Sequence, residues 1–371
     1  MGRLRADNIQ NSTGTSGPIF VGPSEFSTTA HIVLPKGTTA QRPVGVSTGA
    51  LRFNTETLNV EYYNGTDWIE VTWTDPSNRG VFGGGYSVPT TYNIIDYITI
   101  ASTGNATDFG DLTVVRYRLA ACSSSTRGVF GGGATPSISN VIDYITITTT
   151  GNAIDFGDLT VIRSNISGCS SSTRGIFGGG FNQLPGFGQD VNIIDYITIA
   201  SIGNALDFGD LTQSRFGLGA CSSSTRGVFG GGFSYPGVYH NIIDYITIAS
   251  TGNATDFGDL TVARYSLAAC SNNTRAVFGG DALVTNTIDY ITIASTGNAT
   301  DFGDLTVARN GLAACSSSTR GVFGGGATPG TNTNTIDYIT IATTGNATDF
   351  GDLTVSRQEV AACSNTHGGL S

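Results

Sequence analysis

The sequence predicts an all-β protein whose main part is a six-bladed β-propeller, and three observations carry this prediction. A segment of 45 to 52 residues recurs six times beyond residue 78, and its leading arginine falls at Arg79, Arg127, Arg174, Arg226, Arg275 and Arg320. Each copy holds short apolar runs separated by Gly, Ser, Thr and Asn, a pattern typical of strands joined by tight turns. No window shows the apolar spacing of a long helix. A strand-and-turn repeat of this length is the signature of a propeller blade.

Each copy divides into four expected strands. In the clearest copy they are LAACSS (119–124), RGVFGGG (127–133), VIDYITIT (141–148) and AIDFGDLTV (153–161). In the third strand, the side chains that point to one face and those that point to the other are both largely apolar. This is expected for a sheet that other sheets cover on both faces. A TGN-type turn joins the third strand to the fourth and places Gly where a positive φ is expected.

The phase of the repeat predicts how the chain closes. The first copy begins at its second strand, at Arg79, and has no LAAC strand before it. The last copy is followed by one additional strand of the first type, at residues 360–364. This C-terminal strand should complete the first blade, because two open sheet edges would otherwise remain.

The composition excludes several classes of function. A net charge of −10 argues against a phosphate-binding surface, so nucleic acid is not expected as a partner. The N-terminus has no apolar signal region, and no apolar run approaches the length of a membrane span, so neither secretion by signal peptide nor membrane insertion is expected. Charged residues are only 12 % of the chain, which argues against disorder in spite of the 52 glycines.

The cysteines occupy one repeat position. They are Cys122, Cys169, Cys221, Cys270, Cys315 and Cys363. Equivalent positions on packed sheets stand about 10 Å apart, which is too far for a disulfide. We expect buried free thiols and no metal, because no second ligand stands at zinc-site spacing near any of them.

The repeat resembles the kelch family. The shared features are Gly-Gly after an apolar strand, an aromatic residue in the third strand (Tyr97 and its equivalents) and an arginine before the next first strand. The resemblance covers residues 79–366 and implies a propeller. The chain departs from the family in its fourth strand, where Phe109 and its equivalents stand in a DFGD motif in place of tryptophan.

The copies differ from one another on one expected face only. The first-to-second and third-to-fourth strand turns are nearly uniform, whereas the second-to-third strand loops and the residues before each new first strand vary. Both variable segments should share a face, and they carry aromatic residues that suit sugar rings or protein contacts. Neutral loop drift is the alternative. The candidate ligand-binding residues are Tyr86, Tyr92, Tyr117, Arg118, Phe181, Phe187, Phe216, Tyr235, Tyr239 and Tyr265; Phe233 is a further aromatic residue of these loops.

The DFGD carboxylates, such as Asp108 and Asp111, could act as a glycosidase pair or bind Ca²⁺. They recur in every copy, however, whereas an active site needs unlike residues that converge once. We therefore expect turn chemistry with pairing to the repeat arginines, and we expect Asp96 and its equivalents to find an arginine or a backbone N–H. With His31, His240 and His367 scattered, no catalytic residue, metal site or cofactor is expected.

The N-terminal residues are unrelated to the repeat. Gly37 to Pro43, GALRFNT (49–55) and VEYYNGTDW (60–68) together resemble the short β module of tail-fibre and other appendage proteins of tailed bacteriophages. The pattern predicts strands at LRFN, NVEYYN and DWIEV. The expected organisation is an extended arm at 1–31, a β attachment module at 32–78 and the propeller at 79–371.

The resemblance implies a virion appendage protein of a tailed phage, assembled in the host cytoplasm. Its N-terminal segment would dock on other virion proteins, and its propeller loops would recognise a host-surface glycan or protein. The sequence does not distinguish a monomer from a homo-oligomer such as a trimer. The alternatives are a capsid, neck or tail decoration protein without receptor binding, a polysaccharide-degrading enzyme, and a cellular kelch scaffold.

Overall fold

The structure is a computed structural model, and it describes residues 34–57, 59–70, 78–184 and 187–370. The described residues form an all-β protein, as the sequence predicts, with two short 3-10 turns. The chain divides into two compact units, residues 1–74 and 75–371. The expected arm at 1–31 lies outside the described residues.

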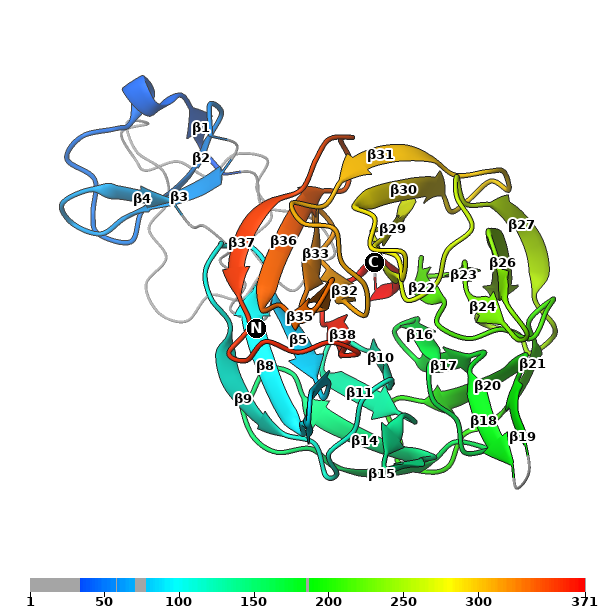
Figure 1. Ribbon diagram of the computed structural model, residues 1–371. Coiled ribbons are helices and arrows are strands. Elements are labelled where there is room, and N and C mark those ends of the chain that lie inside the picture. Colours follow the sequence, from blue (N-terminus) through cyan, green and yellow to red (C-terminus); the bar gives the residue numbers. More distant parts are fainter. Residues whose placement is uncertain (1–33, 58, 71–77, 185–186, 371) are drawn as a thin grey trace, which may run out of the picture. The chain divides into compact units, whose positions relative to one another are not determined.

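The second unit contains six four-stranded antiparallel sheets (Figure 1), which we number 1 to 6. Sheet 1 has the order β38 (Ala361–Ser364), β5 (Arg79–Gly83), β8 (Ile94–Thr99) and β9 (Thr107–Asp111). Sheet 2 contains β10 (Ala120–Ser123), β11 (Arg127–Gly131), β14 (Val141–Thr146) and β15 (Ile154–Asp158). Sheet 3 contains β16 (Ser167–Ser170), β17 (Arg174–Gly178), β20 (Ile193–Thr198) and β21 (Leu206–Asp210).

The remaining three sheets repeat this order. Sheet 4 contains β22 (Gly219–Ser222), β23 (Arg226–Gly230), β26 (Ile242–Thr247) and β27 (Thr255–Asp259). Sheet 5 contains β28 (Ala268–Ser271), β29 (Arg275–Gly279), β30 (Thr287–Thr292) and β31 (Thr300–Asp304). Sheet 6 contains β32 (Ala313–Ser316), β33 (Arg320–Gly324), β36 (Thr335–Thr340) and β37 (Thr348–Asp352). The strands expected in the clearest copy all form, each with its ends shifted inward by no more than three residues.

Strand β38 joins the two ends of the second unit. It pairs antiparallel with β5, with Ala361 opposite Gly83 and Ser364 opposite Gly80. The first strand of every sheet also contacts the first strand of the next, and β38 contacts both β32 and β10. The six first strands therefore lie around one centre, and the fourth strands lie outermost (Figure 1).

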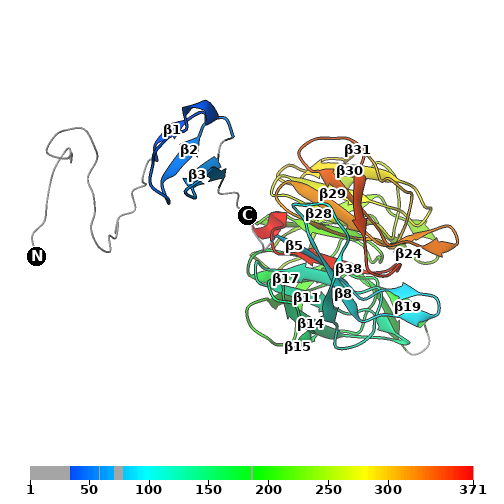
Figure 2. The ribbon, with the colours of Figure 1, turned by 90° about the vertical axis from the view of Figure 1, so that its left-hand side faces the viewer.

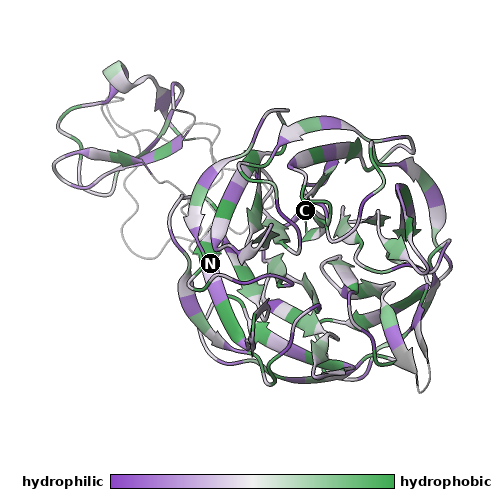
Figure 3. Cartoon of the chain, viewed as in Figure 1, coloured by the Kyte–Doolittle hydropathy of each residue, from purple (hydrophilic) through white to green (hydrophobic). Residues whose placement is uncertain are grey.

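The hydrophobic core lies between neighbouring sheets, and apolar residues recur along the strands of each one (Figure 3). Phe130 of sheet 2 is fully buried against Val81 and Ile95 of sheet 1. A Cβ on Gly83 would lie 2.7 Å from Cε1 of Phe130, so only glycine lets this ring approach the neighbouring strand. The glycines that end each second strand are therefore needed for sheet packing.

A buried ion pair links each sheet to the next. The arginine after the fourth strand of one sheet bonds the aspartate in the third strand of the following sheet, with N–O distances of 2.5 to 3.1 Å. Both side chains of each pair are fully buried. The pairs are Arg116–Asp143, Arg163–Asp195, Arg215–Asp244, Arg264–Asp289, Arg309–Asp337 and Arg357–Asp96. The expectation that Asp96 and its equivalents find an arginine or a backbone N–H is confirmed, and Asp96 has both, since it also accepts from the Thr354 amide.

A threonine hydroxyl completes the surroundings of each carboxylate. Thr354 donates to Asp96 Oδ1 at 2.6 Å, while Arg357 Nη2 also donates to the carbonyl of Phe82 at 3.2 Å. These bonds and the ion pair compensate charges that would be costly to bury alone, although Arg357 Nε makes no hydrogen bond within the described residues. The last pair joins sheet 6 to sheet 1, so it reinforces the same junction that β38 makes.

The second-to-third strand loops contain short hairpins that the repeat pattern did not predict. Five of the six sheets carry one: β6 and β7 (Tyr86–Ser87, Thr90–Thr91), β12 and β13 (Ala134–Thr135, Ser137–Ile138), β18 and β19 (Phe181–Leu184, Phe187–Asp190), β24 and β25 (Phe233–Ser234, Val238–Tyr239), and β34 and β35 (Ala327–Thr328, Thr331–Asn332). The loop of sheet 5, residues 281–286, forms no strand. Loop length and content differ between copies, which is why no common pattern marks these hairpins.

The first unit contains one small sheet of order β1 (Lys36–Gly37), β2 (Leu51–Asn54), β3 (Asn59–Tyr63) and β4 (Trp68–Glu70), with a 3-10 turn η1 (Thr39–Gln41). The three predicted strands are confirmed as β2, β3 and β4. The Asn64 side chain accepts hydrogen bonds from the amides of Thr66 and Asp67, which forms the turn between β3 and β4.

One face of this small sheet is polar and buried. Glu61 is fully buried, and it accepts hydrogen bonds from Arg42, Arg52 and Asn54. Because Arg42 stabilises the charged form, the pKa of Glu61 is held below its usual value. Among the described residues of this unit, the most deeply buried side chains thus belong to a charged and polar network of Arg52, Asn54 and Glu61.

We predict that removing one member of a buried ion pair destabilises the protein more than replacing both members by apolar residues. Arg215→Met should destabilise the protein by about 3–5 kcal/mol, because Asp244 is left charged and buried. Adding Asp244→Leu should restore most of that loss. Urea unfolding followed by circular dichroism measures both variants, and a double variant as unstable as the single one would contradict this account.

We predict that β38 is required for folding of the second unit. A chain ending at residue 359 should not give a monomeric folded protein, because β5 keeps an open edge and the sheet 6–sheet 1 junction is lost. A matched chain ending at residue 366 keeps β38 and should unfold cooperatively. Size-exclusion chromatography and thermal unfolding compare the two; a folded monomer from the shorter chain would overturn the prediction.

Candidate functional site

The two variable segments of each repeat lie next to each other. Isolated β-bridges join a residue before a first strand to the hairpin of the same sheet, as in Tyr117 with Ala134 and Phe216 with Phe233. The strands β19 and β24 of these hairpins project on the side of the second unit opposite the C-terminus (Figure 2). We call the side with the hairpins the loop face and the other side the turn face.

The turn face is uniform because local hydrogen bonds hold it. In the turn between the first and second strands, Ser124 Oγ accepts hydrogen bonds from the amides of Thr126 and Arg127. Ser171, Ser223, Asn272 and Ser317 accept the same bonds in sheets 3 to 6. The repeated turn sequence is therefore explained by turn geometry.

Aromatic side chains gather over sheets 3 and 4 on the loop face. Phe233 stands at the centre of the group, with ring centroids of its neighbours 5.1 to 5.5 Å away. Phe181 joins the group through Phe216 and Tyr235. We call this group the aromatic cluster; it consists of Phe181, Phe216, Phe233, Tyr235, Tyr239 and Tyr265. Five of these are candidate residues from the sequence, and Phe233 was not among the ten.

Polar groups of two hairpins hold Tyr235 in the cluster. Its amide donates to Asp190 Oδ2 at 2.6 Å, which ties the sheet 4 hairpin to the hairpin of sheet 3. Ser234 Oγ and His240 Nε2 lie 2.8 Å apart in the same hairpin. Burial lowers the pKa of His240 and raises that of Asp190. Tyr235 itself remains 61 % exposed, so its ring is available to a ligand.

The other candidate residues lie outside the aromatic cluster. Tyr86 and Tyr117 form a separate pair with ring centroids 5.3 Å apart, and the Arg118 guanidinium lies 5.3 Å from the Tyr117 ring. Tyr92 is half-buried, and its amide donates to the Gly85 carbonyl. For Phe187 the structure describes the backbone, which lies in β19.

A hollow of about 370 Å³ opens beside the aromatic cluster. Aromatic side chains form one part of its wall: Phe181, Phe216, Phe233, Tyr235 and Tyr265. The rest is mostly polar and is formed by Arg118, Asn165, Ser266, Ala282, Asn310 and Glu359. The sequence-based set missed Asn165, Ser266 and Glu359. They occupy the same repeat position as Arg118, and the difference between copies at that position was the available signal.

This shared repeat position forms a closed ring of backbone hydrogen bonds. Its members are Arg118, Asn165, Gly217, Ser266, Gly311 and Glu359, and the N–H of each donates to the carbonyl of the member from the preceding repeat at 2.6 to 3.1 Å. All six have φ between 53° and 65°. Four of them are not glycine and thus hold a strained conformation, which is a feature that gathers at functional sites. We call this arrangement the hydrogen-bonded ring.

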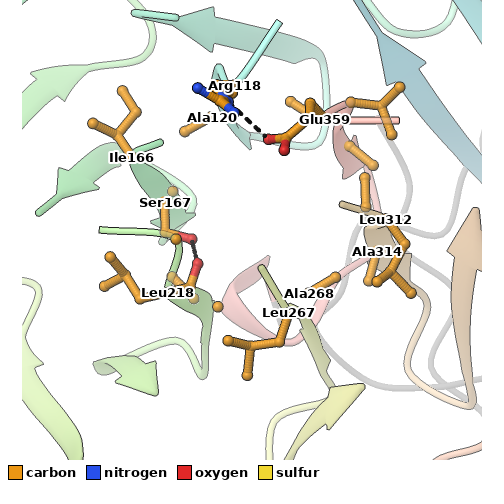
Figure 4. A pocket seen from close by; sticks show the side chains of 18 of the residues that line it. Arg118, Ala120, Ile166, Ser167, Leu218, Leu267, Ala268, Leu312, Ala314 and Glu359 are labelled. Carbon is orange, nitrogen blue, oxygen red and sulfur yellow. Dashed lines mark hydrogen bonds and ion pairs between the residues drawn. The ribbon is translucent and has the colours of Figure 1, made fainter. Parts of the chain in front are cut away.

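The ring surrounds one end of an axial channel between the first strands. Figure 4 shows Arg118 and Glu359 side by side at this end, with Ile166, Leu218 and Leu267 further around the wall. Arg118 Nε lies 3.5 Å from Glu359 Oε2, and the two side chains are 42 % and 17 % exposed. Burial raises the pKa of Glu359, while Arg118 acts in the opposite sense. The ring backbone repeats sixfold, but its side chains do not.

Serines and the C-terminus close the other end of the channel. Each Oγ of Ser123, Ser170, Ser222, Ser271, Ser316 and Ser364 donates to the carbonyl of the previous serine at 2.6 to 2.8 Å. The turn η2 (Gly368–Leu370) contacts β16 and β22 there. His367, which replaces the leading arginine in the repeat, lies with Nε2 3.2 Å from the Ser123 carbonyl.

The six cysteines are free and buried, as expected. Burial raises the pKa of Cys221 and of Cys363 to about 12, so neither thiol is ionised at neutral pH. In the part of the chain that the structure describes, no group of three or more His, Cys, Asp or Glu side chains could hold a metal ion.

The expected pairing of the DFGD carboxylates with arginines is wrong. The arginines before the first strands bond Asp96 and its equivalents instead, and the leading arginines stack on strand tyrosines, as Arg79 does on Tyr97 at 4.6 Å. Within residues 78–184 and 187–370, the DFGD carboxylates form no ion pair. Asp108 is exposed and Asp111 half-buried at the outer edge of the sheet, where the Asp111 amide donates to Asn152. An exposed carboxylate gains little free energy from an ion pair. The DFGD carboxylates therefore do not need an arginine partner.

We predict that the His367 imidazole stays neutral at physiological pH while the turn η2 packs against β16 and β22. The Gly369 amide donates to Nδ1 at 3.0 Å, so Nδ1 carries no proton, and burial lowers the pKa of His367 to about 4. A folded-state pKa below the free value means that the bound turn is fully stable above about pH 6.5 and loses stability as the pH falls toward 4.

NMR titration of the His367 imidazole checks this, with a peptide of residues 361–371 as the unfolded reference. Exchange of the Gly369 amide with solvent should accelerate over the same pH range. A His367 pKa near 6.5 in the folded protein would contradict the assignment of a buried, neutral imidazole.

No helix in the described part of the chain is both long and apolar enough to span a membrane. A comparison of the sequence with protein-family models and with curated proteins finds no match to either.

Proposed function

We propose that this protein is a virion appendage protein of a tailed phage, whose N-terminal unit attaches to the virion and whose loop face recognises a glycan on the host surface. One observation carries the recognition part of the proposal. The turn face repeats almost unchanged, whereas the loop face carries an aromatic cluster, a hollow beside it and a strained ring whose side chains differ between repeats. The phage assignment rests on the resemblance of residues 37–68.

The architecture proposed for the second unit is a six-bladed β-propeller. Support comes from the cyclic order of contacts between first strands, from the pairing of β38 with β5 and from the hydrogen-bonded ring. Propellers bind ligands on one face because their loops gather there while the sheets stay rigid. The hollow lies on such a face.

The chemistry of the loop face suits saccharides. Sugar rings present C–H patches that pack on aromatic faces and hydroxyls that need both donors and acceptors. The hollow offers Tyr235 and Tyr265 on one part of its wall, and Asn165, Ser266 and Asn310 on another. Protein contacts use the same residue types, so direct binding measurements decide between them.

Attachment through the first unit has its own support. The face of the small sheet opposite the Glu61 network carries Leu51, Phe53, Val60, Tyr62 and Ile69. Leu51, Tyr62 and Ile69 stand opposite one another on three strands and are 49 %, 38 % and 38 % exposed. An uncovered apolar sheet face is typical of a protein interface. We assign it to a virion partner or to other copies of the chain.

An enzymatic role has one specific observation in its favour. Ser234 Oγ lies 2.8 Å from His240 Nε2, which is the geometry of a nucleophile and its base. Asp190, however, accepts a hydrogen bond from the Tyr235 amide, and within the described residues His240 donates none to Asp190. We therefore assign this group to positioning of Tyr235. A decoration role is distinguished from recognition by the experiment below.

We predict that binding depends on the sheet 4 hairpin. Residues 233–241 are exchanged for residues 327–334, the equivalent loop of sheet 6, which lacks aromatic residues. Binding to immobilised bacterial envelopes and to a glycan array should fall at least about tenfold, which corresponds to about 1.4 kcal/mol, since several aromatic contacts are lost.

The matched control exchanges residues 134–140 of sheet 2 for the same loop, and it should bind as the natural protein does. Absence of binding by the natural protein to every envelope tested would favour a decoration protein. Equal binding by the sheet 4 and sheet 2 variants would place recognition elsewhere.

A further inference from the structure

We propose that the hollow binds the terminal sugar of an uncharged saccharide, and that Arg118 and Glu359 together hold two neighbouring hydroxyls of that sugar. This inference rests on the proposed function, because it names the ligand class of the same site. The inference goes beyond the proposed function because it assigns the hydrogen bonds to the sugar hydroxyls to one ion pair on the hydrogen-bonded ring.

The size of the hollow favours one or two sugar units. Its volume of about 370 Å³ lies near the lower end of the roughly 300–1,000 Å³ that is usual for small-molecule sites. Phe181, Phe216 and Tyr265 border it and are at least partly buried, while Tyr235 is exposed. A sugar ring that packs on Tyr235 would thus enter with its polar edge toward the ring residues Arg118 and Glu359.

The ion pair is suited to a diol because its two members have opposite hydrogen-bonding capacity. A guanidinium only donates, and an ionised carboxylate only accepts. Arg118 contacts Glu359 Oε2 through Nε, and its Nη atoms donate no hydrogen bond to any part of the chain that the structure describes. One hydroxyl can therefore accept from an Nη while its neighbour donates to the carboxylate.

The charge of the site favours an uncharged ligand. Glu359 compensates Arg118 at 3.5 Å, and the buried arginines beneath the loop face are each paired with an aspartate. A sugar carboxylate would compete with Glu359 for the guanidinium and approach a protein with a net charge of −10. An uncharged diol avoids that repulsion.

The hydrogen-bonded ring fixes the spacing of the two side chains. Arg118 donates its backbone N–H to the Glu359 carbonyl at 2.9 Å, so the two residues are neighbours in the closed cycle. Their φ angles are 59° and 57°, so the backbone at the two positions has the same conformation. Such pre-organisation lowers the entropy lost on binding and sharpens the choice of ligand.

The same geometry supplies well-matched variants. Gly217 and Gly311 occupy this ring position in other repeats, so glycine is compatible with the positive φ. Arg118→Gly and Glu359→Gly should therefore fold and lose only the side chain. Gln358→Ala, beside the ring, is the control that leaves both members of the pair in place.

The probes are methyl glycosides of glucose, galactose, mannose and N-acetylglucosamine, together with the matching glucuronate and galacturonate, measured by saturation-transfer NMR and calorimetry on the full chain. The natural protein should bind at least one neutral glycoside more tightly than its uronate. Both glycine variants should lose at least about tenfold in affinity for that glycoside. Glu359→Gly should also shift preference toward the uronate, since Arg118 becomes unpaired, whereas a folding defect would weaken both.

Tighter binding of uronates by the natural protein would overturn the inference, as would neutral binding that is equal in the glycine variants and the Gln358→Ala control. If envelopes are bound through the sheet 4 hairpin but no neutral glycoside is bound, this inference fails and the proposed function stands. If no envelope is bound either, both fail.

Discussion

The buried arginine–aspartate pair between successive sheets is the interaction on which the rest of the structure depends. Each pair joins the end of one repeat to the third strand of the next, so it sets the position of one sheet relative to its neighbour. Arg357 and Asp96 make this contact between residues far apart in the sequence. Because an unpaired buried charge is costly, an arrangement that leaves one pair unmade is strongly disfavoured. The pairs thus disfavour arrangements in which a sheet packs against a different neighbour.

The cycle in turn makes the loop face possible. Rigid sheets with uniform turns hold six equivalent positions around one axis, and the backbone at these positions closes into a ring of hydrogen bonds. The ring tolerates Arg, Asn, Gly, Ser and Glu because its backbone bonds do not depend on the side chain. Different side chains on a symmetric backbone give an asymmetric site, and this explains how a repeat protein can present a hollow whose wall is aromatic on one part and polar on another.

The sequence allowed the strands, the free cysteines and the partner of Asp96 to be predicted, because each recurs in every copy and obeys local rules. It also indicated that Phe181, Phe216, Tyr235, Tyr239 and Tyr265 belong to a variable surface. It did not separate them from Tyr92, or single out Phe233 as the centre of the cluster. The DFGD carboxylates were assigned the wrong partner, since spacing along the chain does not show which arginine lies across the sheet boundary.

The sequence by itself determined that the chain is all-β, that it repeats six times and that its last strand lies outside the sixth copy, because hydrophobic alternation, turn residues and phase are local properties. Only the tertiary structure decided which variable residues meet. Arg118 and Glu359 are distant in the chain, and they become neighbours because β38 pairs with β5 and the ring closes between them. That juxtaposition depends on long-range pairing, which no local pattern encodes.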